Sequence, residues 1–399
     1  MTTFRAAEYD APTLEALERQ AAVLKENFRK RKYEPVEPPV LQPADIFLDR
    51  SGEDIRRRMY VFPDPGGTEL CLRPDLTIPT CRMYLGRNPK ASGVARLCYN
   101  GSAYRYQPPG KDAPNEFMQA GIECLGVKDR LAADVEVVTL AVDACRDAGL
   151  KTFDLELGDL GLFQALLDSL DISTQARGRL RRQFWRPDYF RSLLQRMSEA
   201  DQDNTTPVDQ DALLSALGAM DDAQARAVVG DVLELADISP VGGRTVAEIA
   251  ERFLEQAAGT STALIPKDQV DQINAFLGIS AVPDKAVSHI RNLLKASPRP
   301  VQTALDRLEK RLALMADNGI DLKKAKLTTE FGRSFEYYTG FVFEVRAGKA
   351  RTKERIVSGG RYDQLLTELG APKEVPAVGF AIWTERLLTA AGAKGRAKK

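Results

Sequence analysis

Two runs of residues that alternate as β-strands do, residues 94–107 and 116–126, are separated by the short segment PPGKDAPN. The prolines and the glycine of this segment predict a loop. A connection this short joins antiparallel strands, because parallel strands need a crossover of about a dozen residues or more. The chain is therefore organised around an antiparallel strand pair.

The second strand of this pair, within NEFMQAGIECLG, has two different faces. Period-two alternation places on the core-like face Met118, Ala120, Ile122 and Cys124. The other face carries Gln119 and Glu123 on either side of Gly121. Four strand residues span roughly 13 Å, so these two side chains could hold the ends of an amino-acid-sized ligand lying over the bare backbone at Gly121. The alternative is a half-exposed strand whose outer face is merely polar.

Helical and strand-like patterns flank this pair. Apolar residues spaced three and four apart predict an amphipathic helix over residues 12–32. The prolines of the next segment, YEPVEPPVLQPADIF, favour an edge strand or an extended arm against a partner surface. Further strands are predicted at residues 69–73, 153–157, 341–345 and 355–358, and helices at residues 77–85 and 132–149. Near the end, SGGRYDQLL predicts a Gly-Gly turn into a helix, and VPAVGFAIWTERLL predicts a strand that runs into a helix.

Residues 159–318 have a different character, because leucine, alanine and charged residues dominate and no convincing period-two run occurs. This pattern predicts a block of short helices, one of them over residues 170–197. Antiparallel strands with a helical insertion indicate an α+β fold built on an antiparallel sheet flanked by helices. We expect a core domain of residues 1–160 and 320–391, a helical insertion of residues 161–319, and a disordered basic tail of residues 392–399.

Charge and composition narrow the classes of function. Lys plus Arg equals Asp plus Glu, 56 against 56, so no global field attracts a polyanion and we expect no nucleic-acid partner. The one local basic patch, RGRLRRQFWR around Trp185, is interpreted as a solvated helix face, with a phosphate or RNA contact as the alternative. No apolar run approaches the length of a membrane span and the N-terminus lacks an apolar signal core, so we expect a cytoplasmic protein.

Histidine and cysteine are few, with one histidine and five cysteines in the chain. The five cysteines include no CxxC pair and lie in apolar surroundings, which predicts reduced core residues. The single histidine, His289, is interpreted as part of a helix surface. We therefore expect neither a metal site nor a cofactor.

Three further motifs complement the polar strand face. RPDLT places Asp75 and Thr77 at the end of a strand, where a carboxylate and a hydroxyl can accept hydrogen bonds from an ammonium group. GRSFEYY brings Arg333, whose guanidinium suits a carboxylate, and a tyrosine pair. SGGRYD supplies two glycines that permit close approach. Together these residue types match a small polar amino acid, although each motif by itself would also fit a surface turn or an exposed strand with salt bridges.

The chain resembles the catalytic core of the histidyl-tRNA synthetases in motifs that occur in the same order: LCLRPDLT, AYRYQPPGKDAPNEFMQAGIE, EFGRSFEYYTGFVFE, and SGGRYD with PAVGFAIWTERL. The resemblance covers residues 12–160 and 320–391, with the helical block where that family carries an insertion. It implies a class II aminoacyl-tRNA synthetase-like antiparallel fold. VEPPVLQP resembles the first class II motif, whose proline, here Pro39, lies at a dimer interface, which implies a homodimer-like surface around residues 35–45.

The resemblance also implies a histidine pocket. Asp75, Thr77 and Gln119 match positions that hold the ammonium group of histidine. The remaining matches are Glu123 and Tyr338, which contact the imidazole, Tyr337 beside them, and Arg333 near the carboxylate and the α-phosphate. Asp75 stands where the synthetases usually have glutamate, a longer carboxylate.

The ATP half of the synthetase pattern is altered. Against FRYERPxxGRxREF the chain has YRYQPPGKDAPNEF, so Arg105 is kept while Gln107 replaces the glutamate and Pro108 the next arginine. The loop arginines of the pattern are replaced by Ala113 and Asn115. In addition, Trp383 occupies a glycine position that meets the adenine, although Arg386 remains. The chain ends 13 residues after Arg386, so we expect it to lack the anticodon-binding domain.

With these features the chain is similar to the family of synthetase-like regulatory subunits of ATP phosphoribosyltransferase. That resemblance implies a subunit that catalyses nothing itself. It implies that the subunit pairs with a short-form catalytic subunit at the first step of histidine biosynthesis and binds histidine for allosteric feedback inhibition. Two alternatives remain open: a divergent or truncated histidyl-tRNA synthetase-like ligase, and a stand-alone amino-acid sensor with another protein partner.

Overall fold

The computed structural model describes residues 8–48, 53–108, 113–184, 187–198, 228, 265–331, 337–348 and 353–392. The chain forms two compact units, one of residues 1–169 with 275–399 and one of residues 170–274. The domain limits expected at residues 160, 319 and 391 stay a prediction. Among the described residues, every helix is too short or too polar to cross a membrane.

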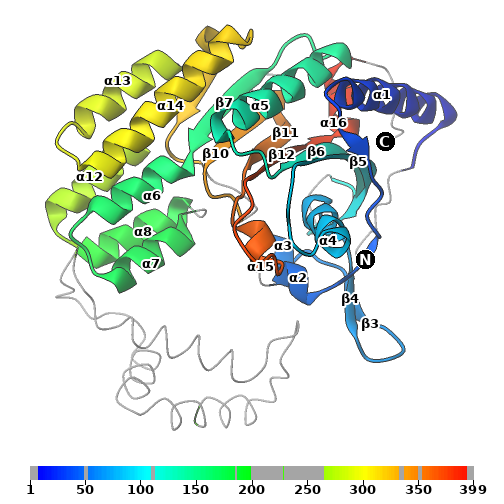
Figure 1. The fold of residues 1–399 in the computed structure, drawn as a ribbon, viewed down its shortest axis with the longest axis horizontal. Helices are drawn as coiled ribbons and strands as arrows, with labels where there is room; N and C mark the ends of the chain where they lie inside the picture. Colours follow the sequence, from blue (N-terminus) through cyan, green and yellow to red (C-terminus); the bar gives the residue numbers. More distant parts are fainter. Residues whose placement is uncertain are drawn as a thin grey trace. The chain divides into compact units, whose positions relative to one another are not determined.

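The first unit is built on a mixed β-sheet (Figure 1). Its strands, in spatial order, are β1 (Glu34–Pro35), β5 (Ala95–Tyr104), β6 (Glu116–Leu125), β12 (Ala377–Trp383), β11 (Glu354–Arg361), β10 (Phe341–Ala347), β7 (Asp154–Asp159), β9 (Ala325–Thr328) and β8 (Ser280–Ala281). The strands from β5 to β7 in this order pair antiparallel, which confirms the α+β class and the central β5/β6 pair. The pairs β1/β5 and β7/β9 are parallel and were not predicted.

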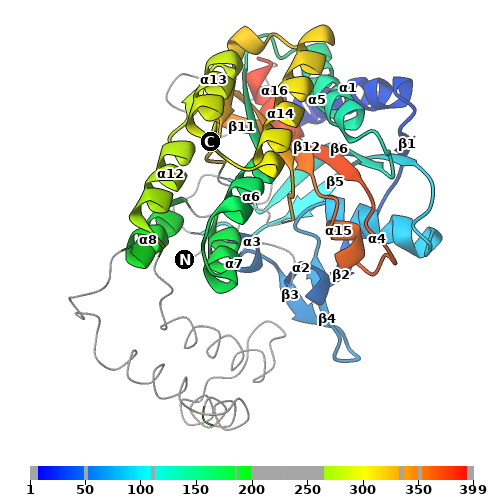
Figure 2. The ribbon, with the colours of Figure 1, turned by 60° about the vertical axis from the view of Figure 1, so that its left-hand side comes forward.

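Helices cover both faces of this sheet (Figures 1 and 2). On one face lie α1 (Ala11–Lys30) and α5 (Arg130–Asp147). The aromatic core on that face includes Phe380, whose ring centroid lies 5.8 Å from that of Phe28 and 6.5 Å from that of Phe343. Helix α1 begins where predicted, because the Asp10 side chain accepts a hydrogen bond from the backbone N–H of Thr13 at 3.0 Å.

The opposite face of the sheet carries smaller elements. These are α2 (Asp45–Leu48), α3 (Glu53–Arg56), α4 (Thr77–Arg87) and α15 (Leu365–Glu368). A second, antiparallel sheet in the order β2-β4-β3 consists of β2 (Leu41–Pro43), β4 (Glu69–Leu72) and β3 (Val61–Pro63). We call the face of the large sheet that these elements cover the site face, because Gln119 and Glu123 point toward it.

The remaining described elements complete the chain. They are α6 (Leu160–Ser169), α7 (Thr174–Gln183), α8 (Pro187–Ser198), α12 (Lys267–Leu277), α13 (Pro283–Leu293), α14 (Arg299–Asp317), the 3-10 turn η1 (Leu322–Lys324) and α16 (Thr384–Ala390). Helix α14 packs against α5 and α6 within the first unit. Helix α16 directly follows β12, as VPAVGFAIWTERLL predicted.

Three predictions about these elements are wrong. The single helix expected over residues 170–197 is two helices, α7 and α8, and the second begins at Pro187, which suits a first helical turn but not a helix interior. Gly359 and Gly360 lie inside β11 instead of forming a turn, because their bare backbone allows neighbouring rings to pack closely. The helical block also contains the short strand β8. Trp185 lies outside the described residues.

Candidate ligand-binding site

The polar side chains singled out on β6 are deeply buried. Gln119 is 1% exposed and Glu123 0%, so the interpretation of this strand as half-exposed is wrong. Asp75, at the turn between β4 and α4, is 3% exposed, and Thr77 at the start of α4 is also buried. Burying so many polar groups is unfavourable unless each finds a partner, so their surroundings indicate what the site can bind.

The Glu123 carboxylate is held by tyrosine hydroxyls. Tyr99 donates a hydrogen bond to Oε1 at 3.1 Å, and Tyr362 donates one to Oε2. Burial raises the pKa of Glu123 from 4.5 to about 8, and hydrogen bonds from Tyr362, Thr77 and Tyr99 oppose this rise. Gly379 faces Glu123 across the strand pair, where a β-carbon would overlap Oε2. A glycine on the neighbouring strand thus leaves room for this carboxyl group, and two tyrosines hydrogen-bond to it.

Tyr99 also changes the expected position of a ligand. In the sheet register it stands opposite Gly121, and a β-carbon on Gly121 would lie 2.6 Å from the Tyr99 hydroxyl. The space directly over Gly121 is thus filled by this ring. The prediction that a ligand lies over bare backbone at Gly121 is wrong, and the glycine instead lets Tyr99 reach Glu123.

Two buried acceptor atoms on the site face are left without a hydrogen-bond partner in the described part of the chain. They are Oδ2 of Asp75 and Oε1 of Gln119. The other oxygen of Asp75 accepts from the backbone N–H of Ile78 at 3.2 Å. Burial raises the pKa of Asp75 from 3.8 to about 6, and the charge of Arg105 opposes this rise. An ammonium group, with three N–H donors and no acceptor, is the kind of partner that such a pair of oxygens lacks.

An aromatic wall stands next to these acceptors. The ring centroids of Tyr337 and Tyr338 are 4.9 Å apart, and those of Tyr337 and Tyr362 are 5.7 Å apart. Gly360 lets the wall approach the sheet, because a β-carbon there would lie 2.8 Å from the Tyr338 ring. Arg333 lies outside the described residues, so its predicted place near a ligand carboxylate stays a prediction.

The residues of the predicted ATP half make hydrogen bonds and ring contacts with other residues of the protein. Arg105 donates from Nε to the Pro74 carbonyl at 2.7 Å, and its guanidinium lies 5.1 Å from the centre of the Phe117 ring. Gln107 accepts a hydrogen bond from Arg58 at 2.6 Å. The side-chain oxygen of Asn115 accepts from the backbone N–H of Gln107 at 2.9 Å, which closes the loop between β5 and β6.

Trp383 fills the site face beside Gln119. The two residues are register partners on β12 and β6, and the indole is 5% exposed. It belongs to a buried cluster with Leu76, Tyr99, Ala103 and Phe117. The guanidinium of Arg386 lies 5.2 Å from the centre of the Trp383 rings, and its Nη1 donates to the Arg355 carbonyl at 3.1 Å. The indole thus occupies space next to the acceptors and leaves it apolar.

Sequence reasoning missed Tyr99, Tyr362, Gly379 and Arg58 as parts of this face. Tyr362 lies within the quoted motif SGGRYD but was given no role. Tyr99 had no distinguishing signal, because its position opposite Gly121 follows from a strand register that the eight-residue loop does not fix. Among the described residues, no group of three or more His, Cys, Asp or Glu side chains is placed to hold a metal ion.

Comparisons with known proteins agree with this architecture. A family model described as Histidyl-tRNA synthetase matches residues 6–242 and 225–387. The fold is shared with a structure from Bacillus halodurans titled ATP phosphoribosyltransferase regulatory subunit/histidyl-tRNA synthetase, at 21% identity and a TM-score of 0.69 over 98% of this chain and 83% of that one. A histidine–tRNA ligase subunit from Alicyclobacillus acidocaldarius is 23% identical with a TM-score of 0.60, over 98% of this chain and 96% of that one.

The fold and the family match define a protein with the class II fold of the histidyl-tRNA synthetases. A relative from Brucella anthropi, named ATP phosphoribosyltransferase regulatory subunit, is 36% identical over 367 residues, which is 91% of this chain and 95% of the relative. A relative of the same name from Brucella ovis is 36% identical over 375 residues, 93% of this chain and 96% of the relative. The chain belongs to the family of ATP phosphoribosyltransferase regulatory subunits.

Proposed function

We propose that this chain is a non-catalytic regulatory subunit that binds histidine and a short-form ATP phosphoribosyltransferase catalytic subunit. In this role it supports the activity of the catalytic subunit and reports histidine for feedback inhibition of the first step of histidine biosynthesis. The name of its relatives supports the regulatory part of the proposal. The chemistry of the site face supports the ligand.

The observation that carries the proposal is the pair of buried acceptors, Asp75 Oδ2 and Gln119 Oε1, without partners in the described residues. A buried acceptor without a partner costs about 1–3 kcal/mol, so a ligand that donates to both gains binding free energy. The ammonium group of an amino acid is such a donor. Glu123, beside the tyrosine wall, offers a carboxylate to an imidazole N–H.

The altered ATP half supports a role without catalysis. Adenylate formation needs cationic groups arranged in advance around the α-phosphate, each worth several kcal/mol in such sites. Here Gln107 and Asn115 close a loop, and Trp383 fills the neighbouring space with an indole. Arg105 and Arg386 are present but are engaged with the backbone and with aromatic rings.

Feedback follows from linkage between two binding events. Histidine inhibits only by as much as it binds the inhibited state of the complex more tightly than the active state, a coupling of typically about 1–3 kcal/mol. The proposal includes a class II-like dimer through residues 35–45, which begin at the edge strand β1. The proposal also places the protein in the cytoplasm and keeps the expected domain limits. It assigns no nucleic-acid partner.

The test uses the purified full chain in three measurements. Calorimetry with histidine should give saturable one-site binding, and co-purification should recover the short-form catalytic subunit. Histidine-dependent exchange of pyrophosphate into ATP should stay at background. Clear exchange would replace the proposal by a synthetase-like ligase, whereas histidine binding without capture of the catalytic subunit would leave an amino-acid sensor with another partner.

A further inference from the structure

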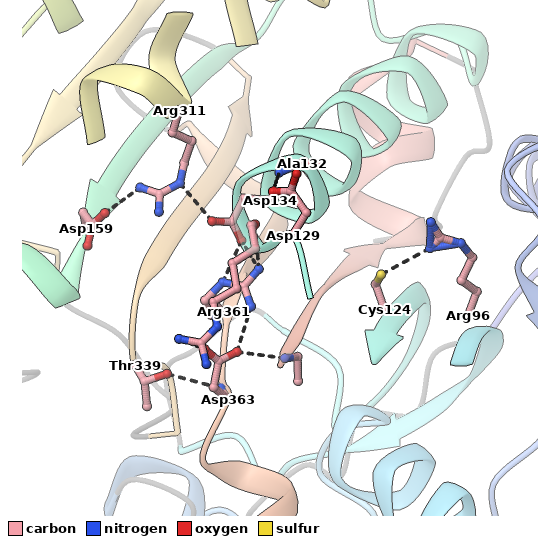
Figure 3. Close-up of polar contacts among 12 residues, drawn as sticks. Arg96, Cys124, Asp129, Ala132, Asp134, Asp159, Arg311, Thr339, Arg361 and Asp363 are labelled. Atoms are coloured by element: carbon pink, nitrogen blue, oxygen red, sulfur yellow. Dashed lines mark hydrogen bonds and ion pairs between the residues drawn. The ribbon is translucent and has the colours of Figure 1, made fainter. Parts of the chain in front are cut away.

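A chain of buried ion pairs lies behind the candidate site (Figure 3). Arg311 on α14 donates from Nε to Asp134 Oδ2 at 2.9 Å and from Nη1 to Asp159 Oδ2 at 2.6 Å. Arg361 on β11 donates from Nε and Nη2 to the other oxygen of Asp134 at 2.9 and 2.6 Å. From Nη1 it donates to Asp363 at 2.7 Å. We call these five residues the buried ion-pair chain.

One end of the buried ion-pair chain meets the site through Tyr362. This tyrosine stands between Arg361 and Asp363 in the sequence, and its hydroxyl donates to Glu123. Neighbouring side chains of an extended segment point to opposite faces, so Tyr362 reaches the site face while Arg361 is held from behind. Asp363 is fixed as well, because it accepts from the backbone N–H of Ala377 at 2.8 Å. Residues anchored on both sides of Tyr362 restrict where its hydroxyl can point.

The other end of the buried ion-pair chain meets the start of α6. Asp159 Oδ1 accepts a hydrogen bond from the backbone N–H of Leu162 at 3.1 Å and so caps this helix. Helix α6 ends at Ser169, where the chain passes into the second compact unit. Arg311 therefore joins the start of α6 and the α14 helix to the residues that hold Tyr362.

We propose that Arg311 is a positioning residue that acts through Asp134, Arg361 and Tyr362 to fix the tyrosine hydroxyl on Glu123 and thereby sets the affinity of the site. The inference rests on the proposed histidine site. Buried ion pairs contribute little net stability compared with well-packed apolar residues, so stability alone gives no reason for this arrangement, whereas holding one geometry does. Any shift of α6 or α14 would reach the ligand along this route, which makes the buried ion-pair chain a candidate for allosteric coupling.

The experiment compares Arg311→Met and Arg311→Lys with a matched control, Arg291→Met. Arg291 on α13 pairs with Asp306 and Glu309 of the same α14 helix at 2.9 and 2.8 Å, but at the surface, with its side chain 43% exposed. Histidine affinity is measured by calorimetry on the full chain. Each variant is measured twice, once with Tyr362 kept and once combined with Tyr362→Phe. Without histidine, fluorine NMR of 3-fluorotyrosine incorporated at position 362 reports the environment of the hydroxyl.

We expect Arg311→Met to weaken histidine binding by about fivefold or more, the lower end of typical coupling. Arg311→Lys should recover part of the affinity, and the loss should vanish when Tyr362→Phe is present. The fluorine resonance should move in Arg311→Met and stay in place in Arg291→Met.

A folded Arg311→Met variant with wild-type affinity and an unmoved resonance would overturn the inference. An equal loss with and without Tyr362→Phe would also do so, because Arg311 would then have a merely structural role. If Arg311→Met does not fold, Arg311→Lys and Asp159→Asn are measured in the same way. The asparagine can still cap α6 by accepting from the backbone N–H of Leu162. If the wild-type chain binds no histidine, the proposed function fails and the fluorine resonance alone decides the inference.

Discussion

Replacing Glu123 by glutamine should stabilise the ligand-free protein at high pH and at the same time weaken its binding of histidine. Burial raises the pKa of Glu123 from 4.5 to about 8, so the folded protein holds a proton there that the unfolded chain releases. The contribution of this protonated side chain to the free energy of unfolding is therefore fully present below pH 4.5 and is lost as pH rises through 8. Since one pKa unit equals about 1.4 kcal/mol, ionising Glu123 in the folded state costs up to about 5 kcal/mol at pH 9.

Glu123→Gln removes this cost but replaces the carboxylate by an amide. One tyrosine hydroxyl can still donate to the amide oxygen, and the other must turn to accept from the amide nitrogen, so part of the gain is offset by roughly 1–2 kcal/mol. We expect the variant to be more stable than the wild type by about 3–4 kcal/mol at pH 9 and less stable by roughly 1–2 kcal/mol at pH 4.5, where Glu123 is protonated and only the offset remains. Urea denaturation at both pH values, followed by circular dichroism, measures this difference.

Histidine affinity should move in the opposite direction. At pH 9, where Glu123 is ionised, a hydrogen bond to the charged carboxylate contributes about 1.5–3 kcal/mol, so calorimetry at that pH should show a loss of roughly tenfold to 150-fold. The matched control is Glu344→Gln on β10, a second buried glutamate that pairs with Arg346 and Arg355 at 2.7 and 2.9 Å. Breaking those pairs should destabilise the protein and leave histidine affinity unchanged.

The two readouts refute different steps of this reasoning. A Glu123→Gln variant that is less stable than the wild type at pH 9 would refute the unfavourable burial of the charged carboxyl. A variant that gains stability but binds histidine as tightly as the wild type would refute the assignment of Glu123 to the ligand.

Three further predictions concern the same face. Tyr338→Phe should weaken histidine about fivefold to 150-fold in calorimetry, because an imidazole nitrogen loses its hydroxyl partner at a cost of about 1–3 kcal/mol; unchanged affinity would remove Tyr338 from the site. Trp383→Gly should leave pyrophosphate exchange at background and lower the free energy of unfolding by about 3–5 kcal/mol, whereas recovered exchange would show that the altered loop is not limiting. Histidine affinity should fall below pH 6, where Asp75 gains a proton and its attraction for the ammonium group is lost. Asp75→Asn should bind more weakly at pH 7.5 with a flatter pH profile, and an unaltered profile would contradict this role.

Much of the architecture could be predicted because it depends on local patterns. The short proline-rich loop after residue 107 fixes the antiparallel pairing of β5 and β6, and alternation alone assigns Gln119 and Glu123 to the face opposite Ile122. What alternation cannot supply is the depth of burial, since a polar strand face looks the same whether water or tyrosines cover it. Their burial depends on α4 and on residues after 337, which are distant in the chain.

The positioning residues could not be found from the sequence for a different reason. Asp134 and Arg361 are 227 positions apart, and Asp134 and Arg311 are 177 apart, so no spacing rule connects them. In the sequence, Asp134 is one of six charged residues on α5, and nothing in the pattern distinguishes it from the others. Only the packing of α14 and β11 against α5 reveals that its charge is paired on both oxygens.

Under the proposed function, the site face shows how a sensor and a ligase can share one fold and differ in chemistry. The acceptor atoms of Asp75 and Gln119 have no partner among the described residues, whereas Gln107 accepts from Arg58 and Trp383 packs in a buried cluster. A sensor needs only a difference in affinity between two states, but a ligase needs cationic groups arranged for a transition state. Restoring that arrangement would require an arginine at position 115, the release of Gln107 from Arg58 and an opening where the indole packs. We expect that no single change suffices. With only one change made, the remaining features still block ATP or leave its phosphate charge without a cationic partner.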